Sequence, residues 1–345
     1  MLTAADYRPP HWLRNRHVQS ILSSSPLRVR RGQQLLADTR AVTTKHIIDG
    51  GDGVRLQGLH SVMPGSAPRR LALLLHGWEG SVNSSYMRLT TAHLLVKGFD
   101  VFRLNFRDHG DTYHLNEALF HSNRIDEVVH AAREVSNRFA TQPMVVAGYS
   151  LGGNFALRVA LRAPAAGLSL AHAAAVCPVL DPARTMTQME QGVGFYNWYF
   201  AHKWRRSLVR KRKLFPQQHD YDDQLLKQGL RDLTRWLVEQ HTDFATLDAY
   251  FDGYNIAGER MAGLTVPVSI LTSEDDPVIP VSDFRGWQLP EHAHLEIARW
   301  GGHCGFLQSA KLDGFAERWV ADRLASAVAA DDGASAVMKP ESHAL

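Results

Sequence analysis

The amino-acid sequence predicts a doubly wound α/β fold with a mostly parallel sheet of eight strands. Short apolar runs alternate with longer segments of helical periodicity, which is the pattern of strands separated by crossover helices. The runs are apolar at nearly every position, as in strands that helices cover on both faces. The chain has 345 residues, of which 45% are hydrophobic and 21% are charged, so it can bury one large core.

Six apolar runs of strand length predict the parallel part of the sheet. They lie at residues 71–76, 101–106, 144–150, 172–180, 266–273 and 294–300. Two earlier runs, at residues 42–48 and 54–62, predict two antiparallel strands at one edge and bring the total to eight. Helical patterns occupy residues 84–98 and 121–139, the segment after Ser150, and residues 309–324.

The alternation of strands and helices breaks at residues 183–260, which predict an all-helical cap inserted into the core. One helical pattern there places Leu226, Leu230, Leu233 and Leu237 on a single face. The insertion follows the C-terminal end of a strand, where open α/β sheets bind ligands, so we expect it to roof the site. The other predicted parts are an N-terminal extension packing on the core at 1–40, the core at 41–182 and 261–326, and a disordered tail at 327–345.

Composition and charge narrow the class of partner. The formal net charge of +3 and the lack of nucleic-acid-binding signatures favour a small-molecule substrate and no nucleic-acid partner. The N-terminus has no signal-peptide pattern, and no apolar run reaches the roughly 18 residues of a membrane span, so we expect a cytoplasmic protein. Cys177 and Cys304 are the only cysteines and lack the spacing of metal ligands, which predicts reduced thiols and no metal site.

The segment GYSLGGN, residues 148–154, places one serine among glycines between a predicted strand and a predicted helix. The sharp turn at such a serine is tolerated only where the residues two positions away lack side chains, which Gly148 and Gly152 provide. The turn would lift the Ser150 hydroxyl above the sheet edge, near the free N–H groups of a helix N-terminus. The spacing therefore predicts a nucleophile elbow, although GxSxG alone also fits a glycine-rich turn without chemistry.

A serine hydroxyl needs a base to take its proton and an acid to orient that base. In this architecture the acid and then the histidine follow the serine, each in a loop at the C-terminal end of a strand. His303 comes directly after the last predicted strand, between glycines, and is the predicted base. The loop after residues 266–273 offers Asp275 and Asp276, of which we favour Asp276 because the next turn would place its carboxylate at the strand end.

Two backbone N–H groups are predicted to stabilise the oxyanion that forms in acyl transfer. One belongs to Leu151, which follows the serine, and the other to Trp78 in the loop HGWEGS after the strand at residues 71–76. Gly77 allows the chain to approach the serine closely at this point. His76 is expected to hold the loop by a hydrogen bond rather than to act as the base.

With these residues in view, the chain resembles the α/β hydrolase superfamily and, within it, the YheT-like branch of bacterial relatives of the eukaryotic ABHD-type lipid hydrolases. The segments that carry the resemblance are GYSLGGN, LHGWEGS, NFRDHGDTYHLNEALFHS and the opening YRPPHWLRNRHVQSIL, whose N.H.Q pattern separates this branch from other hydrolases. The resemblance covers nearly all of the chain. It implies an α/β-hydrolase fold, serine ester hydrolase activity, no cofactor, and a triad of Ser150, Asp276 and His303. Asp108 departs from the pattern, because many hydrolases have a glycine there.

Residues 195–215 combine aromatic side chains with a basic run at 203–213. Such a helix can lie on an anionic membrane, which gives a hypothesis of weak membrane association. The acids that follow from Asp220 onward favour the alternative that the charges are matched within the cap or solvated. The aromatic side chains, together with Trp78, are candidates for the lining of an apolar acyl pocket.

The leading functional hypothesis is a carboxylic ester hydrolase that acts on acyl esters, including lipid-like ones, through an acyl-enzyme intermediate. A thioesterase or an acyltransferase would use the same triad, and these residues do not separate the three. A catalytically silent binding protein of the same fold is the alternative from another class. The natural substrate, the acyl chain length and the oligomeric state stay open.

Overall fold

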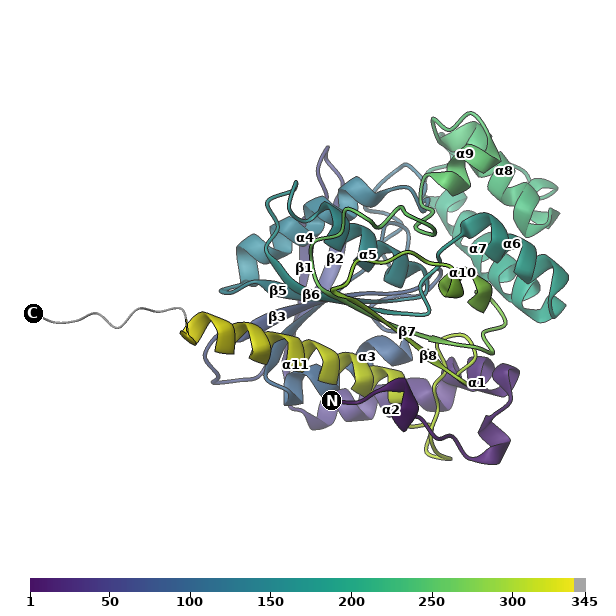
Figure 1. The fold of residues 1–345 in the computed structure, drawn as a ribbon. Coiled ribbons are helices and arrows are strands. Elements are labelled where there is room, and N and C mark those ends of the chain that lie inside the picture. Colours follow the sequence, from purple (N-terminus) through teal and green to yellow (C-terminus); the bar gives the residue numbers. More distant parts are fainter. Residues whose placement is uncertain (338–345) are drawn as a thin grey trace, which may run out of the picture.

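An eight-stranded sheet forms the centre of the protein (Figure 1). The computed structural model describes residues 1–337. The strands are β1 (Val42–Asp49), β2 (Arg55–Val62), β3 (Arg70–Leu75), β4 (Phe99–Leu104), β5 (Met144–Tyr149), β6 (Leu170–Val176), β7 (Val268–Ser273) and β8 (Ala293–Ala298). Their order is β1-β2-β4-β3-β5-β6-β7-β8, with β1–β2 and β2–β4 antiparallel and the other neighbours parallel. The predicted sheet, with two antiparallel strands at one edge, is confirmed.

Helices cover both faces of this sheet (Figure 1). On one face, α4 (Ile125–Phe139) and α5 (Leu151–Arg162) contribute to the larger hydrophobic cluster. On the other, α3 (Ser85–Val96) and α11 (Phe315–Val337) contribute to a second cluster. β3, β4, β5 and β7 are consequently buried at every position. Double coverage is the physical reason why the predicted strands read as unbroken apolar runs.

Between β6 and β7 the described chain forms helices and no strand. They are α6 (Pro182–Gln191), α7 (Gly194–Leu214), the short 3₁₀ helix η3 (Leu225–Lys227), α8 (Leu230–His241) and α9 (Leu247–Asp252), and α10 (Val281–Arg285) follows β7. α6 begins where the Asp181 side chain accepts a hydrogen bond from the Arg184 N–H, with Pro182 in its first turn. These helices gather at one end of the sheet (Figure 1), and we propose residues 183–260 as the limits of this cap.

The leucine-rich pattern of the cap is not one continuous helix. Leu226 lies in η3, and α8 begins only at Leu230, because Gln228 and Gly229 adopt extended backbone conformations with ψ angles of 160° and 166°. The four leucines of the pattern are nevertheless all buried, namely Leu226, Leu230, Leu233 and Leu237. Periodicity therefore identified the buried side chains and missed the break in the helix.

Residues 1–40 contain η1 (Ala4–Asp6), η2 (His11–Leu13), α1 (Arg16–Ser23) and α2 (Pro26–Asp38). α2 lies against α3, and Arg28 of α2 pairs with Glu317 of α11 at 2.6 Å, with side-chain exposures of 0% and 1%. The Tyr7 hydroxyl donates a hydrogen bond to the Leu307 carbonyl at 3.0 Å. These contacts attach the segment to the face of the sheet that α3 and α11 cover.

The predicted disordered tail at 327–345 is wrong for its first part. α11 continues to Val337, so residues 327–337 are helical, and residues 338–345 lie outside the described residues. The small and polar composition suggested disorder, but the same segment is rich in alanine, which has the highest intrinsic helix propensity.

We predict that Arg28→Ala lowers the free energy of unfolding by about 3–5 kcal/mol, because it leaves the buried carboxylate of Glu317 without its partner. The matched control is Arg31→Ala on the same helix, whose ion pair with Asp313 is exposed (44% and 40%) and is worth about 1 kcal/mol or less. Urea denaturation measures both changes. Equal losses in the two variants would contradict the prediction.

Candidate active site

Ser150 occupies the turn between β5 and α5 in a conformation that non-glycine residues rarely adopt, with φ 54° and ψ −121°. The chain passes very close to itself here. A Cβ atom added at Gly148 would lie 1.9 Å from the Gly152 carbonyl oxygen, and one added at Gly152 would lie 2.3 Å from the Leu75 carbonyl oxygen. Both glycines are therefore required by direct contact between backbone segments, which is the steric reason for the spacing around the serine.

Three loops bring the predicted triad residues together. The Ser150 Oγ lies 2.9 Å from Nε2 of His303, and Nδ1 of His303 lies 2.9 Å from Oδ2 of Asp276. The other carboxylate oxygen of Asp276 accepts hydrogen bonds from the backbone N–H groups of Val278 (2.8 Å) and Ile279 (3.0 Å). Ser150 follows β5, Asp276 follows β7 and His303 follows β8, so parallel strands deliver all three side chains to one edge of the sheet.

The two candidate acids have different partners in the structure. Asp276 contacts His303, whereas Oδ1 of Asp275 accepts a hydrogen bond from the Gly302 N–H at 2.9 Å. Asp275 thus holds the backbone next to the histidine and does not contact the imidazole. The order of residues along the sequence had left both candidates open, because adjacent residues in a loop differ only in the direction of their side chains.

The environment of His303 favours its protonated form. Burial opposes charging of the imidazole, but the negative charge and hydrogen bond of Asp276, together with a smaller contribution from Cys304, outweigh this effect, and the pKa of His303 is raised to about 9. The side chain of Asp276 has no exposure and that of His303 has 11%, so solvent screens their attraction only weakly. The same attraction that orients the imidazole would stabilise the imidazolium formed when it takes a proton from the serine.

The two predicted oxyanion donors flank the serine. Leu151 is the first residue of α5, and Trp78 lines the same cavities as Ser150. Among residues 1–337, neither backbone N–H has a hydrogen-bond acceptor, as expected of groups kept for a ligand. Gly77 makes the approach possible, because a Cβ there would be 3.2 Å from the Tyr149 carbonyl oxygen and 3.3 Å from the Ser150 Cβ.

The loop that carries Trp78 is held from two sides. The buried His76 accepts a hydrogen bond from the Phe106 N–H at Nε2 (3.2 Å), so its Nδ1 donates to the Gly77 carbonyl (2.8 Å). Burial lowers the pKa of His76 well below its usual value and keeps this imidazole neutral. On the cap side, Lys203 donates to the Glu79 carbonyl at 2.6 Å, and the Ser207 hydroxyl donates to the Glu79 carboxylate at 2.7 Å. The sequence analysis missed these two contacts from α7.

Two cavities meet at Ser150, which lines both. The smaller one, of about 90 Å³, is lined mainly by apolar side chains, among them Trp78 and residues of α6, α7, α8 and α9. The larger one, of about 510 Å³, is lined by His303 and by residues of α1 and α7. Trp78 stacks on Phe200 with ring centroids 5.5 Å apart and meets Trp204 edge-on at the same distance, so the cap and the core close the smaller cavity together.

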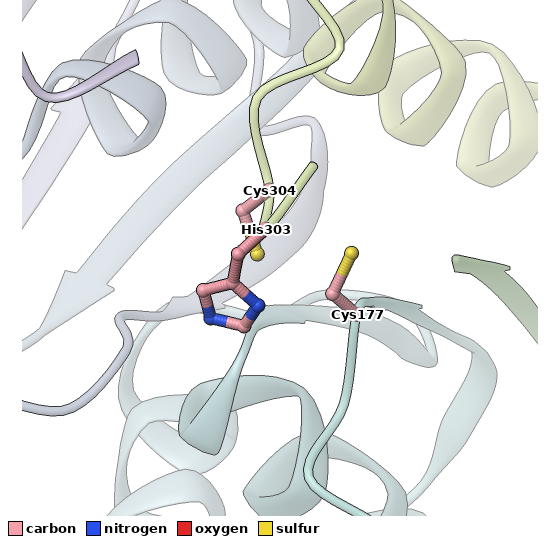
Figure 2. A group of neighbouring side chains, drawn as sticks. All are labelled: Cys177, His303 and Cys304. Carbon is pink, nitrogen blue, oxygen red and sulfur yellow. The ribbon is translucent and has the colours of Figure 1, made fainter. Parts of the chain in front are cut away.

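Two thiols lie beside the imidazole, although 127 positions separate Cys177 and Cys304 in the sequence (Figure 2). One ligand atom from each of Cys177, His303 and Cys304 lies within 4.8 Å of the others, and thiolates and imidazoles are preferred ligands of Zn²⁺. However, Asp276 and Ser150 already engage both ring nitrogens of His303, so a metal would remove the base from the triad. Burial also raises the pKa of the Cys177 thiol well above its usual value. We therefore assign no metal to this cluster.

Asp108, the departure from the hydrolase pattern, adopts a left-handed backbone conformation with φ 58°. Glycine is favoured in that region, which explains why a glycine suits this position in other hydrolases. Here the carboxylate is buried and accepts two hydrogen bonds. Oδ1 accepts one from the Lys211 Nζ at 2.6 Å, and Oδ2 accepts one from the Phe120 N–H at 2.9 Å. Asp108 thereby joins the core to α7.

Most basic side chains of the 203–213 run have partners inside the chain. Besides Lys203 and Lys211, these are Arg205 with the Gln228 carbonyl, Arg210 with the Gly110 carbonyl and Asp111, and Arg212 with the Tyr221 carbonyl and Asp223. Phe195 and Trp198 of α7 are exposed (39% and 57%). No helix among the described residues combines the length and the apolar character needed to cross a membrane.

The sheet order and the serine turn between β5 and α5 define an α/β hydrolase fold. The chain belongs to the family Hydrolase_4, described as "Serine aminopeptidase, S33", whose model matches residues 66–295. It is 23% identical over 260 residues to the putative esterase YheT of Escherichia coli (strain K12), covering 73% of this chain and 74% of that relative. It is also 23% identical over 255 residues to phospholipase ABHD3 of Bos taurus, covering 70% of this chain and 60% of that relative. The resemblance to the YheT-like branch is confirmed.

Solved structures show the same fold. The esterase of Pyrococcus furiosus aligns with a TM-score of 0.57 at 16% identity, covering 85% of this chain and 92% of that one. The esterase of Pyrobaculum calidifontis aligns with a TM-score of 0.55 at 16% identity, covering 93% and 99%. At this level of identity the likeness concerns the fold alone.

We predict a pH dependence of kcat/KM that follows deprotonation of His303. A base acts only in its neutral form, so a pKa raised to about 9 places the midpoint of the acid limb near pH 9, with activity lost as the pH falls. Asp276→Asn removes the charge that contributes most to raising this pKa. It should move the acid limb to lower pH and reduce the plateau by about 10⁴-fold.

The control for this pH profile is Glu274→Gln, which removes an exposed acid of the same loop that pairs with Arg285. Its acid limb and plateau should match the wild type. A profile of Asp276→Asn with an unshifted limb would show that another group controls the ionisation.

Proposed function

We propose that this protein is a serine-dependent carboxylic ester hydrolase. The observation that carries the proposal is the continuous contact from Ser150 through His303 to Asp276, with 2.9 Å at each step. In this mechanism Nε2 of His303 takes the hydroxyl proton as Ser150 Oγ forms a bond to the ester carbonyl carbon. The protonated His303 then gives the proton to the leaving alkoxide, which departs as an alcohol and leaves an acyl-enzyme. Water attacks the acyl-enzyme by the same route and releases the carboxylic acid.

The oxyanion of each tetrahedral intermediate is stabilised by the N–H groups of Leu151 and Trp78. Both lack an acceptor within residues 1–337, and Leu151 adds the positive end of the α5 dipole. Donors held in place by the protein need no reorganisation when the negative charge develops, and this is often the largest contribution to acyl transfer. The hydrogen bonds of His76 and of Lys203 keep the Trp78 loop in position.

The acyl group occupies the smaller cavity. Its lining is mostly apolar and aromatic, and the hydrophobic side chains of α6 to α9 close it over Ser150. The larger cavity, which His303 lines, receives the alcohol part, because the histidine delivers its proton to the leaving oxygen.

A thioester or an acyl acceptor other than water would use the same groups. Cytoplasmic location is part of the proposal. Weak association with anionic membranes through residues 203–213 is the less favoured alternative, because most basic side chains of this run have partners inside the chain, and liposome sedimentation at low and high salt tests it.

The first test is hydrolysis of p-nitrophenyl esters from acetate to palmitate by the wild type and by Ser150→Ala. We expect the wild type to be active with an optimum longer than acetate, and Ser150→Ala to lose on the order of 10⁶-fold in kcat, because nothing replaces the nucleophile. A fluorophosphonate probe should label the wild type at Ser150 and leave the variant unlabelled.

Three outcomes would change the proposal. Equal inactivity of both proteins, without labelling of Ser150, would favour the silent binding protein of this fold. Faster cleavage of an aminoacyl p-nitroanilide than of any ester would assign a peptidase activity instead, in line with the family description. A preference for acetate over every longer chain would remove the acyl pocket from the proposal.

The cavity assignment gives a further prediction. Met186 of α6 lines the smaller cavity and is 6% exposed, so Met186→Trp should fill space meant for the acyl chain. We expect kcat/KM for octanoate to fall about tenfold or more, with that for acetate within about threefold, since a single methylene in such a pocket is worth tenfold or more. Parallel losses for both esters in a folded variant would place the acyl chain elsewhere.

A further inference from the structure

The loop that carries His303 is held by the sheet and by the N-terminal segment. From the sheet, the Ser273 hydroxyl of β7 donates a hydrogen bond to the Gly302 carbonyl at 2.9 Å, and the Cys304 thiol lies 3.7 Å from the Val176 carbonyl oxygen at the end of β6. The loop joins β8 to α11, and the isolated bridge between Leu307 and Gly314 is its one ladder contact among the described residues. Cys304 and Phe306 have positive φ angles of 55° and 44°, in the region that favours glycine. Such conformations persist only where the surroundings hold them in place. The position of the predicted base therefore depends both on these sheet contacts and on contacts from outside the sheet.

α1 supplies one of these contacts at the histidine itself. The backbone N–H of His303 donates a hydrogen bond to the Ser20 Oγ at 2.9 Å. The Ser20 hydroxyl donates its own proton to the Arg16 carbonyl at 2.7 Å, one turn earlier in α1. Because that proton is committed, the lone pairs of the hydroxyl stay directed at His303.

Gln19, the neighbouring residue, holds the other end of the loop. Its Oε1 accepts from the Leu307 N–H at 2.6 Å, and its Nε2 donates to the Leu307 carbonyl at 3.2 Å. The two hydrogens of Nε2 are shared among three acceptors, of which the Tyr7 hydroxyl (2.7 Å) and the Leu13 carbonyl (2.6 Å) are nearer than the Leu307 carbonyl. The side chain is fully buried, so the Leu307 N–H and the Leu13 carbonyl would lose their partner if the amide were removed.

The loop and α1 are in direct backbone contact. A Cβ atom added at Gly302 would lie 2.4 Å from the Arg16 carbonyl oxygen, and one added at Gly305 would lie 2.7 Å from the Gln19 carbonyl oxygen. Gly302 and Gly305, which the sequence analysis noted only as neighbours of the predicted base, are thus sites where α1 touches the loop. Neither α1 nor His303 lies within residues 66–295, the part that the family model matches.

We propose that Gln19 and Ser20 are positioning residues, which hold the 301–307 loop so that Nε2 of His303 stays within hydrogen-bond distance of the Ser150 hydroxyl. The inference rests on the proposed function for its kinetic consequences and on the contacts above for its structural ones. Neither residue touches the reacting atoms. They act through the backbone of the loop, and their removal leaves His303 free to move away from Ser150 and Asp276.

The experiment compares full-length Ser20→Ala and Gln19→Ala with the wild type on p-nitrophenyl butanoate. We expect kcat to fall about tenfold for Ser20→Ala and about a hundredfold for Gln19→Ala, with KM within about threefold, because displacement of a catalytic group by about 1 Å costs on the order of a hundredfold. The acid limb of the pH profile should also move to lower pH as contact with Asp276 loosens. Ser20→Thr keeps the hydroxyl and should restore most of the activity.

The matched control is Gln33→Ala in α2, which removes an exposed glutamine and should behave as the wild type. Thermal unfolding reports whether each variant is folded, and if Gln19→Ala is not, the Ser20 variants decide. A folded Ser20→Ala with the kcat and acid limb of the wild type would overturn the inference and leave the proposed function intact.

An NMR titration of the His303 imidazole separates the two proposals. If the wild type hydrolyses no ester, the proposed function fails, and a lower pKa of His303 in Ser20→Ala than in the wild type would still support positioning by α1. An identical titration in both proteins would overturn the positioning role, whatever the activity of the wild type.

Discussion

The close approach of backbone around Ser150 is the constraint on which the rest of the site depends. The chain leaves β5, turns at a serine with φ 54° and enters α5 so tightly that a methyl group at Gly148 or Gly152 would meet another carbonyl within 2.3 Å. This geometry fixes the serine against the ends of β3 and β6, since the Ser150 N–H donates to the Val176 carbonyl at 2.9 Å. It also sets where the other groups must be. A base, an acid and two N–H donors are useful only within reach of this one hydroxyl.

The groups that meet the serine come from loops, and segments outside the parallel sheet help to hold these loops. α7 holds the Trp78 loop through Lys203 and Ser207 and the loop after β4 through the Lys211–Asp108 pair, whereas α1 holds the His303 loop through Gln19 and Ser20. The buried Arg28–Glu317 pair attaches α2, which follows α1, to α11. Buried charges are tolerated in these places because each faces an opposite charge, and Arg28, Lys211 and Asp108 make further hydrogen bonds. The sheet places these loops at one edge. Two flanking segments, α1 with α2 and α7, hold the loops in the position that the site requires.

The fold and the identity of the central residues follow from local patterns. Apolar runs covered on both faces predicted the strands, and the spacing of Gly148, Ser150 and Gly152 predicted the turn, because both depend on neighbours in the sequence. Other features depend on contacts between distant segments. The choice between Asp275 and Asp276 depends on side-chain direction in a loop, and the proximity of Cys177 to Cys304 depends on the packing of β6 against the histidine loop. The YRPPHWLRNRHVQSIL opening was noted as a family feature, but nothing local in it indicates that Gln19 reaches Leu307. The sequence analysis also missed two helix boundaries. The leucine pattern did not indicate the break at Gly229 before α8, and the small and polar composition hid the continuation of α11 through an alanine-rich segment to Val337.

The two flanking segments are themselves connected, and this has a consequence for the site. Nδ1 of His17 in α1 lies 2.9 Å from the Tyr196 hydroxyl in α7, with the rings 5.7 Å apart. α1 and α7 both line the larger cavity, so this contact bridges the segment that holds the base and the helix that holds the oxyanion loop. A displacement of α7 that opened the cap would therefore have to break the His17–Tyr196 contact or pull on α1, and through Ser20 on His303. A short path of direct contacts thus connects the cap with the loop that carries His303, and every step of it joins two neighbouring side chains or a side chain and a backbone group.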